Sequence, residues 1–472
     1  MSKFYITNAI PYVNAKPHIG HALEFIQSDV IARFHRLLGD KTILLCGGDE
    51  NAIKNVQAAE KAEQPIQEFI DENTQLFSEV AKNLHVQFDV FQKGSDEKHH
   101  LASQKLWKLC DKNSDIYKKS YTGFYCVGCE QFYEKEELDK AGECFEHPGR
   151  KLDEVSEENY FFKLSHYTDQ IIKLIESDEL KIVPIVRKNE ALAFLKRGLK
   201  DISISRSNER AKNWGVSVPG DETQKMYVWF DALNIYQSGV GFGFDENQYN
   251  AWWPADIHVI GKGILRFHAI YWIAFLLSAK LALPKSIFVH EYITVNGQKM
   301  SKTLGNVIDP NELISTYGAE ALRYFMLAKL SPFSDGDFSE SKLKETYNSD
   351  LANGLGNLIA RIAKLCEKVA LNIQPISQPL DEAVVTKLNE YKFNEALNIV
   401  WDKISRLDKH INEKKPWTLE GDDLNTFLQE ASTDIISIAS NLQPFLPETA
   451  EKILTQFSGS IKSAPSLFPR IQ

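Results

Sequence analysis

Residues 4–46 read FYITNAIPYVNAKPHIGHALEFIQSDVIARFHRLLGDKTILLC, and the order of apolar and turn residues in this stretch decides the fold. A β-prone run at residues 4–9 is followed by prolines that exclude helix until about Pro17. Apolar residues then recur every three or four positions up to Gly39, which predicts an amphipathic helix. Residues 42–46 are typical of a fully buried parallel strand. This order opens a doubly wound α/β domain, whose ligands bind at the carboxyl ends of the strands.

The α/β pattern is interrupted and then resumes. Residues 257–261 and 286–290 are strand-like, and an apolar helix around residues 267–279 lies between them. Between about residues 120 and 150 the periodic pattern gives way to tyrosine, cysteine, glycine and charged residues, so we expect an insertion that splits the domain. From about residue 340 the pattern is helical, with a buried leucine-rich stripe and no convincing strand.

The composition is that of a folded protein with several domains. The chain has 472 residues, 43% hydrophobic and 25% charged, which excludes wholesale disorder and suggests roughly three domains. A net charge of −10 argues against coating nucleic acid or anionic membrane through bulk positive charge, but allows a local basic face. The apolar run at residues 269–277 is too short for a membrane helix.

The N-terminus and the cysteines indicate the compartment. Residues 1–8 have neither the apolar core of a signal peptide nor a transit segment, so we expect the mature chain to begin here. Six cysteines without a secretory signal indicate a reducing, cytoplasmic setting. We expect Cys46, Cys110 and Cys366 to be small buried apolar residues.

The motif PHIGH, at residues 17–21, lies where the first strand meets the first helix. Backbone N–H groups and the helix dipole favour a phosphate at such a place. His18 and His21 add side-chain donors, and Gly20 allows a ligand to approach the backbone closely. The alternative is that both histidines only cap the helix or pack against the loop, and the motif alone leaves both interpretations open.

The motif KMSKT, at residues 299–303, follows a strand and a turn that ends at Gly297. Lys299 and Lys302 can both move onto the phosphate charge that develops in a phosphoryl or nucleotidyl transfer. Taken alone, this motif is better explained as a solvated lysine cluster.

Two tight pairs of metal-ligand residues lie in the insertion. Tetrahedral Zn²⁺ takes four nitrogen or sulfur ligands, and pairs separated by two residues supply them. Metal binding also explains how this segment folds without an apolar core. Four protein ligands leave no open position, so we predict one structural zinc ion; chance placement of surface thiols is the alternative. The predicted ligands are Cys126, Cys129, Cys144 and His147.

Together, the motifs at residues 18–21 and 299–303 in a split α/β fold resemble the HIGH and KMSKS signatures of the class I aminoacyl-tRNA synthetases. Thr303 stands where that family usually has serine and keeps the hydroxyl. The resemblance covers nearly the whole chain. Within the class, three further stretches resemble the methionyl-tRNA synthetases. They are NAIPY at residues 8–12, VWFDALNIY at residues 228–236 and GKGILRFH at residues 261–268.

The resemblance assigns site residues. Aromatic and apolar surface suits the thioether of methionine, which makes few polar demands; without the resemblance each aromatic residue is more simply a core residue. The methionine site would comprise Ala9, Ile10, Tyr12, Trp229, Ala232, Tyr236, Ile264 and His268, with Asp49 binding the α-amino group. The ATP site would comprise His18, Gly20, His21, Lys299, Ser301 and Lys302, of which His18, His21, Lys299 and Lys302 are catalytic.

Three residues depart from the family pattern on the adenosine side. Asn51 and Ala52 stand where the family usually has His and Gly, and Gly263 stands where an Asp is common. Because Asn51 can still donate and accept hydrogen bonds, we expect altered rather than absent ATP binding.

Residues near the C-terminus resemble an RNA-reading surface. Trp417 matches the family's anticodon-stacking tryptophan, and Asn357 and Arg361 match its cytosine readers. Asn357 and Arg361 share one helix face with Asn353, and stacking combined with polar contacts to a splayed base distinguishes single-stranded RNA loops. A buried tryptophan beside a solvated polar face is the alternative.

The resemblance implies a methionine–tRNA ligase that uses ATP with Mg²⁺ to form methionyl-adenylate and then charges tRNA(Met). The enzyme would also bind the CAU anticodon of that tRNA. The chain ends soon after residue 470, where some relatives add a dimerisation domain, so we expect a monomer. The expected segments are two halves of a Rossmann-type catalytic domain at residues 1–115 and 226–290, a zinc-knuckle connective insertion at 116–225, a KMSKS-loop and stem-contact region at 291–345, and an all-α anticodon-binding bundle at 346–472.

Other functions are weighed against this one. The insertion is too small for the editing domain of the valine, isoleucine and leucine enzymes, and a cysteine-specific enzyme would hold zinc in its substrate pocket. A nicotinamide oxidoreductase fails because no GxGxxG follows the first strand. A non-catalytic zinc-ribbon RNA-binding protein would explain residues 126–147 and Trp417, but not the paired nucleotide motifs.

Overall fold

The computed structural model describes residues 2–126, 131–133, 135–144, 149, 151–300, 304–374 and 378–471. Internal contacts divide the chain into two compact units. The first unit comprises Met1–Lys16, Asp40–Glu79 and Phe88–Val289; the second comprises Pro17–Gly39, Val80–Gln87 and His290–Gln472.

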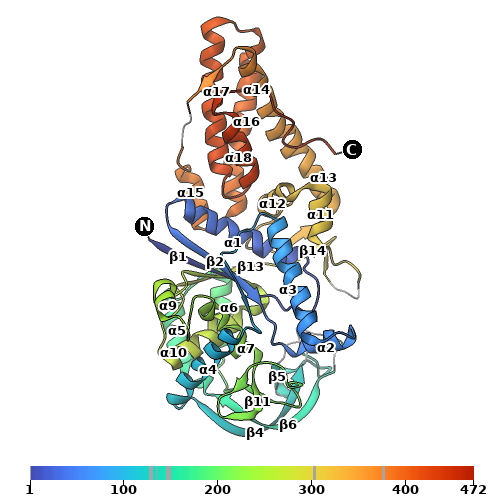
Figure 1. Cartoon of the computed structure of the whole chain (residues 1–472), viewed down its shortest axis with the longest axis vertical. Helices are drawn as coiled ribbons and strands as arrows, with labels where there is room; N and C mark the ends of the chain where they lie inside the picture. The colour runs from blue at the N-terminus through green and yellow to red at the C-terminus, as the bar shows by residue number, and fades with distance from the viewer. Residues whose placement is uncertain are drawn as a thin grey trace. The chain divides into compact units, whose positions relative to one another are not determined.

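A six-stranded sheet forms the centre of the first unit, and Figure 1 labels three of its strands, β1, β2 and β13. The strand order is β3-β2-β1-β12-β13-β7. β1 pairs in parallel with β2 and β12, β2 with β3, and β13 with β7. The predicted parallel α/β fold is therefore confirmed, although β2 is fully buried only from Leu44 onward. The strands are β1 (Lys3–Asn8), β2 (Lys41–Gly48), β3 (Val90–Lys93), β7 (Lys181–Val183), β12 (Ile257–Gly261) and β13 (Ser286–His290).

The apolar helix predicted around residues 267–279 is confirmed as a core element. It begins as a π-helical segment, Phe267–Tyr271, and continues as α10 (Trp272–Ala279). Every residue of it except Leu277 is buried, so its apolar character follows from its position in the core. No helix in the described ranges is both long and apolar enough to span a membrane. The other helices of this unit are α2 (Ile53–Lys61), α4 (Glu97–Lys112), α5 (Thr168–Glu176), α6 (Ile185–Leu195), α7 (Val228–Ala232), α8 (Ile235–Ser238) and α9 (Glu246–Trp252); α3 (Ile66–Asn83) runs from the first unit into the second.

Residues 116–225 contain antiparallel strands and one strand of the parallel sheet. β4 (Ile116–Cys126) pairs with β6 (Asp153–Phe162) along nearly its whole length, and β5 (Gln131–Tyr133) and β8 (Ile202–Ser203) flank this pair. The chain then passes through α5 to β7 and so contributes the edge strand of the parallel sheet. A separate antiparallel sheet is formed by β9 (Ser205–Ser207), β10 (Ser217–Val218) and β11 (Asp221–Met226).

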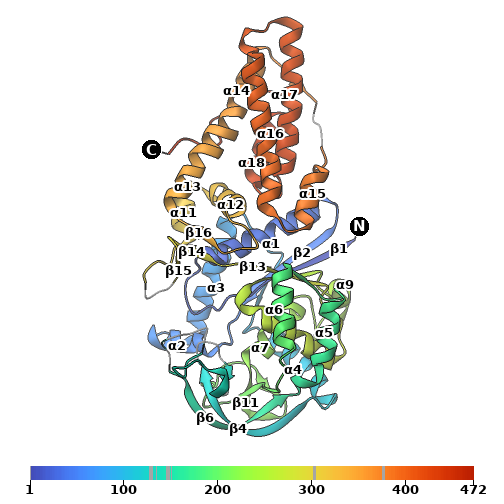
Figure 2. The same ribbon diagram turned by 180° about the vertical axis from the view of Figure 1, so that it is seen from behind.

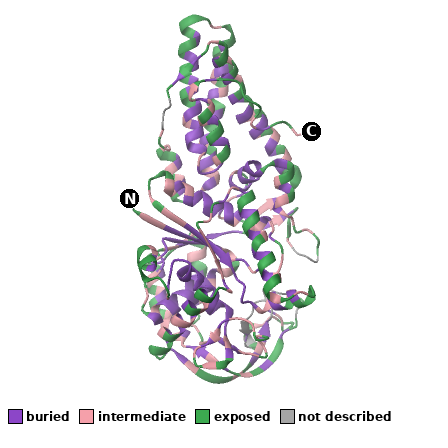
Figure 3. Cartoon of the chain, viewed as in Figure 1, coloured by how far each residue is buried: buried purple, intermediate pink, exposed green. Residues whose placement is uncertain are grey.

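The second unit is mostly helical. α14, α16 and α17 run side by side in both Figure 1 and Figure 2, and Figure 3 shows their buried faces turned toward one another. In the predicted leucine-rich stripe, Leu351, Leu355, Leu358 and Ile362 are buried. The helices are α1 (Ile19–Leu37), α11 (Pro310–Tyr317), α12 (Ala319–Ala328), α13 (Glu340–Thr346), a π-helical segment (Tyr347–Gly356), α14 (Asn357–Lys368), α15 (Glu382–Asn389), α16 (Phe393–Lys414), α17 (Gly421–Leu442) and α18 (Pro447–Gln456).

Short strands also occur in the second unit. β14 (Ile293–Val295) pairs with β15 (Gln298–Lys299) and with β16 (Gly336–Phe338). The expectation of no strand after residue 340 needs one correction, because Asn372–Ile373 (β17) pairs with Gly459–Ser460 (β18). A two-residue pair carries no periodic signal, which is why the sequence pattern did not predict it.

Candidate active site

The two histidines of the PHIGH motif cap α1 in the second unit. Nδ1 of His18 accepts from the Gly20 N–H at 3.1 Å, and Nδ1 of His21 accepts from the His18 N–H at 3.1 Å. The two rings stack with their centroids 3.9 Å apart. Because each Nδ1 is an acceptor, a neutral ring must carry its proton on Nε2. Capping therefore orients the Nε2–H donors, and the capping and phosphate-binding interpretations are compatible.

The charge state of His21 follows from its surroundings. Burial lowers the pKa of His21 well below its usual range, and the nearby His18 and His290 lower it further. His21 is therefore neutral at physiological pH and can donate a hydrogen bond from Nε2 without carrying a charge. His290, at the end of β13, in turn lies 2.8 Å through Nε2 from a carboxylate oxygen of Glu24 on α1.

Glycine is required at position 20 for a structural reason as well as for the predicted functional one. A Cβ at this position would lie 2.9 Å from Cε1 of His18 and 3.0 Å from its Nδ1. Any side chain would therefore displace the ring that caps α1. The requirement for glycine is set first by the His18 ring, before any ligand binds.

The lysine motif is joined to the start of α1. Lys299 is exposed at the end of β15, whereas Ser301, Lys302 and Thr303 lie outside the described residues. After the motif, the Ile308 carbonyl accepts a hydrogen bond from the Ile19 N–H at 3.1 Å. The chain that follows the lysine motif therefore contacts the PHIGH motif within the second unit.

The turn before the lysine motif is held by a residue that sequence reasoning missed. Asn296 and Gly297 both have positive φ, as a tight hairpin turn requires. Oδ1 of Asp337 accepts from the Gly297 N–H at 2.6 Å and from the Thr294 hydroxyl at 2.9 Å. These hydrogen bonds, with that from Lys342, lower the pKa of Asp337, and keep its carboxylate ionised as an acceptor for the turn.

The predicted methionine-site residues come together in the first unit. The Tyr12 ring meets Trp229 edge-on, with centroids 6.4 Å apart. Trp229 stacks on Phe267 at 3.8 Å and meets His268 edge-on at 6.3 Å. Its indole Nε1 is buried without an acceptor among the described residues. Such a donor is costly unless a ligand or water accepts from it. The remaining members are Ala9 and Ile10 after β1, Ala232 on α7, Tyr236 on α8, and Ile264 after β12.

His268 is held in one tautomer. Its Nδ1 lies 3.0 Å from the Ile264 carbonyl, which can only accept, so the ring proton is on Nδ1. Nε2 then accepts from the Tyr236 hydroxyl at 2.8 Å. Burial lowers the pKa of His268 to about 4, although the hydrogen bond to Ile264 opposes this shift. His268 is therefore neutral near pH 7, although Nζ of Lys54 lies 3.9 Å from the centre of the Tyr12 ring.

The low pKa of His268 predicts a pH dependence of stability. An unfolded histidine binds a proton at about pH 6.5 whereas the folded one resists protonation, so the free energy of unfolding should fall as the pH drops from about 6.5 to about 4, by about 3 kcal/mol from this residue. Urea unfolding at several pH values across this range should show a weaker dependence of the free energy of unfolding on pH in His268→Gln than in the wild type. If the free energy of unfolding depends equally on pH in the wild type and in His268→Gln, the low pKa of His268 is contradicted.

Asp49 lies at the carboxyl end of β2, beside Tyr12. Residues 12 and 49 form a single parallel bridge, and the Asp49 N–H donates to the Pro11 carbonyl at 2.9 Å. The Asn55 amide donates to the Asp49 carbonyl at 2.8 Å. These backbone contacts fix a nearly buried carboxylate next to the aromatic cluster, as a binding group for an ammonium requires.

Asn51 has a structural partner that the sequence did not reveal. Its amide donates to the Gly94 carbonyl at 2.8 Å and to Asp231 on α7 at 2.6 Å. Asp231 also accepts from the Ser103 hydroxyl and lies 2.9 Å from Nε2 of His99. Burial opposes ionisation of Asp231, but these partners outweigh it and lower the pKa. Asn51 therefore supports the helix that carries Trp229 and Ala232. Ala52 is buried and Gly263 exposed, and what these departures mean for adenosine stays a prediction.

Two of the four predicted zinc ligands, Cys126 and Cys144, are described by the structure, and their positions are consistent with binding one metal ion. Sγ of Cys126 and Sγ of Cys144 are both buried and lie 3.2 Å apart. Cys129 and His147 lie outside the described residues. Across the described ranges, no three His, Cys, Asp or Glu side chains form a metal-binding group, so the zinc site stays a prediction. Cys46, Cys110 and Cys366 are buried, as predicted.

The predicted RNA-reading residues share one surface of the second unit. Nη1 of Arg361 donates to Asp408 at 2.7 Å, and Nη2 donates to Asn412 at 3.0 Å. The guanidinium carbon lies 6.0 Å from the centre of the Trp417 ring. Trp417 is 53% exposed, which contradicts the alternative of a buried tryptophan. Asn357 is exposed one turn before Arg361 on α14.

Comparison with known proteins identifies the family. Residues 4–363 match the family model described as tRNA synthetases class I (M). The chain is 40% identical to the methionine–tRNA ligase of Thermotoga maritima over 97% of the chain and 75% of that protein. It is also 40% identical to the methionine–tRNA ligase of Brucella suis over 96% of the chain and 91% of that protein.

Solved structures agree with these relatives. Mycobacterium tuberculosis methionyl-tRNA synthetase in complex with methionyl-adenylate is similar with a TM-score of 0.92 and 34% identity, over the whole of both chains. The ligand-free form of that enzyme gives a TM-score of 0.84 and 32% identity, over 100% of this chain and 99% of the other. A non-catalytic zinc-ribbon protein does not fit such relatives. The chain therefore belongs to the methionine–tRNA ligases, class I synthetases that activate methionine and charge tRNA with it.

Proposed function

We propose that this chain joins L-methionine to ATP, giving methionyl-adenylate and pyrophosphate, and passes the methionyl group to tRNA(Met). The observation that carries the proposal is the aromatic cluster of Tyr12, Trp229, Tyr236 and His268, with the buried Asp49 bridged to Tyr12. Aromatic surface suits a thioether, and a carboxylate suits an α-ammonium group. The named relatives and the adenylate complex support the same reaction.

The proposed roles follow from the geometry. The methionine carboxylate attacks the α-phosphorus of ATP and pyrophosphate leaves, so positioning and charge stabilisation dominate. Nε2–H of His18 and of His21 would donate to the phosphates beside Gly20. Lys299 and Lys302 would neutralise transition-state charge, with Ser301 between them. Mg²⁺ is expected to accompany ATP, and no residue of this chain is assigned to it.

Amino-acid-dependent ATP–pyrophosphate exchange tests the proposal. A panel of amino acids should give exchange with methionine and not with isoleucine, valine, leucine or cysteine. Exchange with none of them would refute the activity, and exchange with another amino acid but not methionine would refute the specificity.

The predicted zinc site gives a separate test. We propose that Cys126, Cys129, Cys144 and His147 hold one structural Zn²⁺, which the adjacent Cys126 and Cys144 thiols support. The Cys144→Ser variant should bind less than one zinc per chain by elemental analysis and should unfold at a lower temperature, because metal binding contributes to folding. Cys110→Ser, in the same unit but away from this set, should keep its zinc. Full zinc content in Cys144→Ser would contradict the ligand assignment.

We also propose that Asn357, Arg361 and Trp417 read the CAU anticodon. Trp417→Ala is expected to raise the KM for tRNA by about five- to 150-fold, because stacking of a base on an aromatic ring contributes roughly 1–3 kcal/mol. Trp417→Phe keeps an aromatic face and should show a smaller rise. ATP–pyrophosphate exchange needs no tRNA, so the exchange rate of each variant shows whether its catalytic site is intact. Wild-type tRNA kinetics in Trp417→Ala would refute the role.

A cytoplasmic location and a monomeric state complete the proposal. Gel filtration with light scattering tests the oligomeric state directly. A dimer at micromolar concentration would contradict the proposed monomeric state.

A further inference from the structure

His99 on α4 joins two short helices of the first unit. Its side chain is fully buried. Nδ1 lies 2.7 Å from the hydroxyl oxygen of Ser238 on α8, and Nε2 lies 2.9 Å from Oδ1 of Asp231 on α7. The hydroxyl of Ser103, one turn after His99 on α4, also donates to Oδ1 of Asp231 at 2.7 Å. The helix α4 therefore holds both α7 and α8 through polar contacts in the core.

The helices α7 and α8 depend on such contacts for their positions. They contain five and four residues, and within the described residues neither has a side-chain hydrogen bond that caps its N-terminus. A helix of one turn is not stable by itself in water, because nucleation of a helix is unfavourable. Trp229 and Ala232 of the predicted methionine site lie on α7, and Tyr236 lies on α8. The position of α8 relative to α7 therefore sets the distance of Tyr236 from the other two residues.

Trp229 and Tyr236 lie on either side of one partner. Trp229 meets the His268 ring edge-on at 6.3 Å, and the Tyr236 hydroxyl lies 2.8 Å from Nε2 of His268. A shift of α8 relative to α7 would change the spacing of these three rings. Since the rings would surround the thioether of the substrate, the same shift would change the space left for its side chain.

We propose that His99 is a positioning residue that sets the width of the methionine site by fixing α8 relative to α7. The imidazole ring is rigid and contacts Ser238 and Asp231 through its two nitrogens, so it holds them at one separation. His99 would act through these two residues and not by contact with the substrate. The inference rests on the proposed methionine activation, and it adds a determinant of side-chain length.

The selectivity between methionine and ethionine, its S-ethyl analogue, tests the proposal. The kcat/KM for each amino acid is measured in ATP–pyrophosphate exchange, and the ratio of the two values does not depend on how much of a variant is folded. Ser238→Ala and His99→Gln both remove the contact to α8, since the glutamine amide lies near the position of Nε2 and keeps Asp231. We expect each to lower the ratio about tenfold, because one methylene in a fitted pocket changes kcat/KM by roughly 10- to 200-fold.

His99→Asn is the conservative variant. Its amide lies near the position of Nδ1 and can keep the contact to Ser238, while Ser103 still donates to Asp231. We therefore expect His99→Asn to keep the selectivity ratio within about twofold of the wild type.

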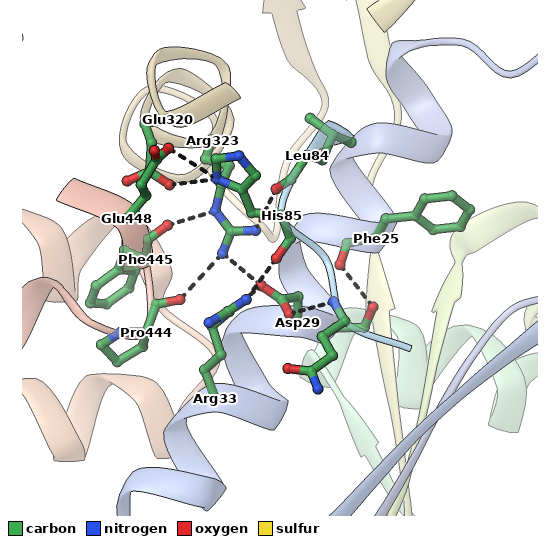
Figure 4. A network of polar contacts seen from close by, with 12 residues as sticks. Phe25, Asp29, Arg33, Leu84, His85, Glu320, Arg323, Pro444, Phe445 and Glu448 are labelled. Atoms are coloured by element: carbon green, nitrogen blue, oxygen red, sulfur yellow. Dashed lines mark hydrogen bonds and ion pairs between the residues drawn. The ribbon is translucent and has the colours of Figure 1, made fainter. Parts of the chain in front are cut away.

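Two controls separate positioning from loss of stability. Ser278 is also a buried serine of the first unit, and its hydroxyl donates to Asp115 at 2.7 Å. In the second unit, the buried Asp29 accepts from Nε of Arg33 at 2.7 Å and lies 2.8 Å from Nη2 of Arg323 (Figure 4). Arg33→Met thus removes one partner from a buried aspartate, as the variants of His99 do. Ser278→Ala and Arg33→Met should each lower the Tm and keep the wild-type ratio.

The possible outcomes are distinct. A wild-type ratio in Ser238→Ala or in His99→Gln would overturn the positioning role, because the contact to Asp231 would then suffice. A loss of selectivity in His99→Asn as large as in His99→Gln would also overturn it, as would an equal loss in Ser278→Ala or Arg33→Met. Absence of methionine-dependent exchange in the wild type would refute the proposed function and this inference with it.

Discussion

His21→Asn is expected to lower the kcat of methionine-dependent ATP–pyrophosphate exchange by roughly a hundredfold, the usual cost of losing one preorganised donor to transition-state charge. The asparagine carbonyl can take the place of Nδ1 and accept from the His18 N–H, so the cap of α1 should survive. What the variant lacks is the Nε2–H donor. Its Tm should therefore stay near that of the wild type while exchange falls.

The complementary variant is His21→Gln. The longer amide can place a donor near the position of Nε2, but it does not reproduce the acceptor at Nδ1. We expect it to retain more exchange activity than His21→Asn and to have a lower Tm. The opposite order of activities would show that His21 acts only as a helix cap, which is the alternative that the sequence left open.

Trp229→Ala is expected to raise the KM for methionine roughly 30-fold, because the substrate side chain would lose about 2 kcal/mol of apolar and sulfur–aromatic contact. Trp229 is the residue that Tyr12, Phe267 and His268 all contact. Exchange rates measured over a range of methionine concentrations give KM and kcat separately. Trp229→Phe keeps a ring for the stack on Phe267 and should show a smaller rise.

Trp107→Ala is the matched control for this variant. Trp107 is also a buried tryptophan of the first unit, and it meets Phe230 edge-on at 5.3 Å. Its removal should lower the Tm but leave the KM for methionine unchanged. If both alanine variants raise that KM equally, general loosening of the core explains the effect and the direct role of Trp229 is refuted.

The parts of the fold that could be predicted from the sequence are those with strong periodicity. α1 shows its apolar stripe and its end before Gly39 directly, and β1, β2, β12 and β13 are short apolar runs between turn residues. β7 was not predictable because three residues carry no measurable alternation, and its pairing depends on β13, which lies about a hundred residues later.

The site could be predicted only as far as its motifs extend. The residues at positions 18–21 and 228–236 are recognisable by type and order. The partners that hold them are not, since Asn51 meets Asp231 across 180 positions and Arg323 meets Asp29 across almost 300. No local pattern marks a residue whose partner is brought to it by the tertiary fold. Asp337, which fixes the turn before the lysine motif, is a further example.

The placement of β7 limits how the protein can be shortened. Deleting residues 116–225 as a block would remove the edge of the parallel sheet together with the antiparallel arm, and would expose the backbone of β13 beside Ile287 and Val289. A bare apolar edge strand invites pairing between chains. A truncated variant that keeps α5, β7 and α6 and trims only the arm formed by β4 and β6 should therefore express as a folded chain, whereas the full deletion should aggregate.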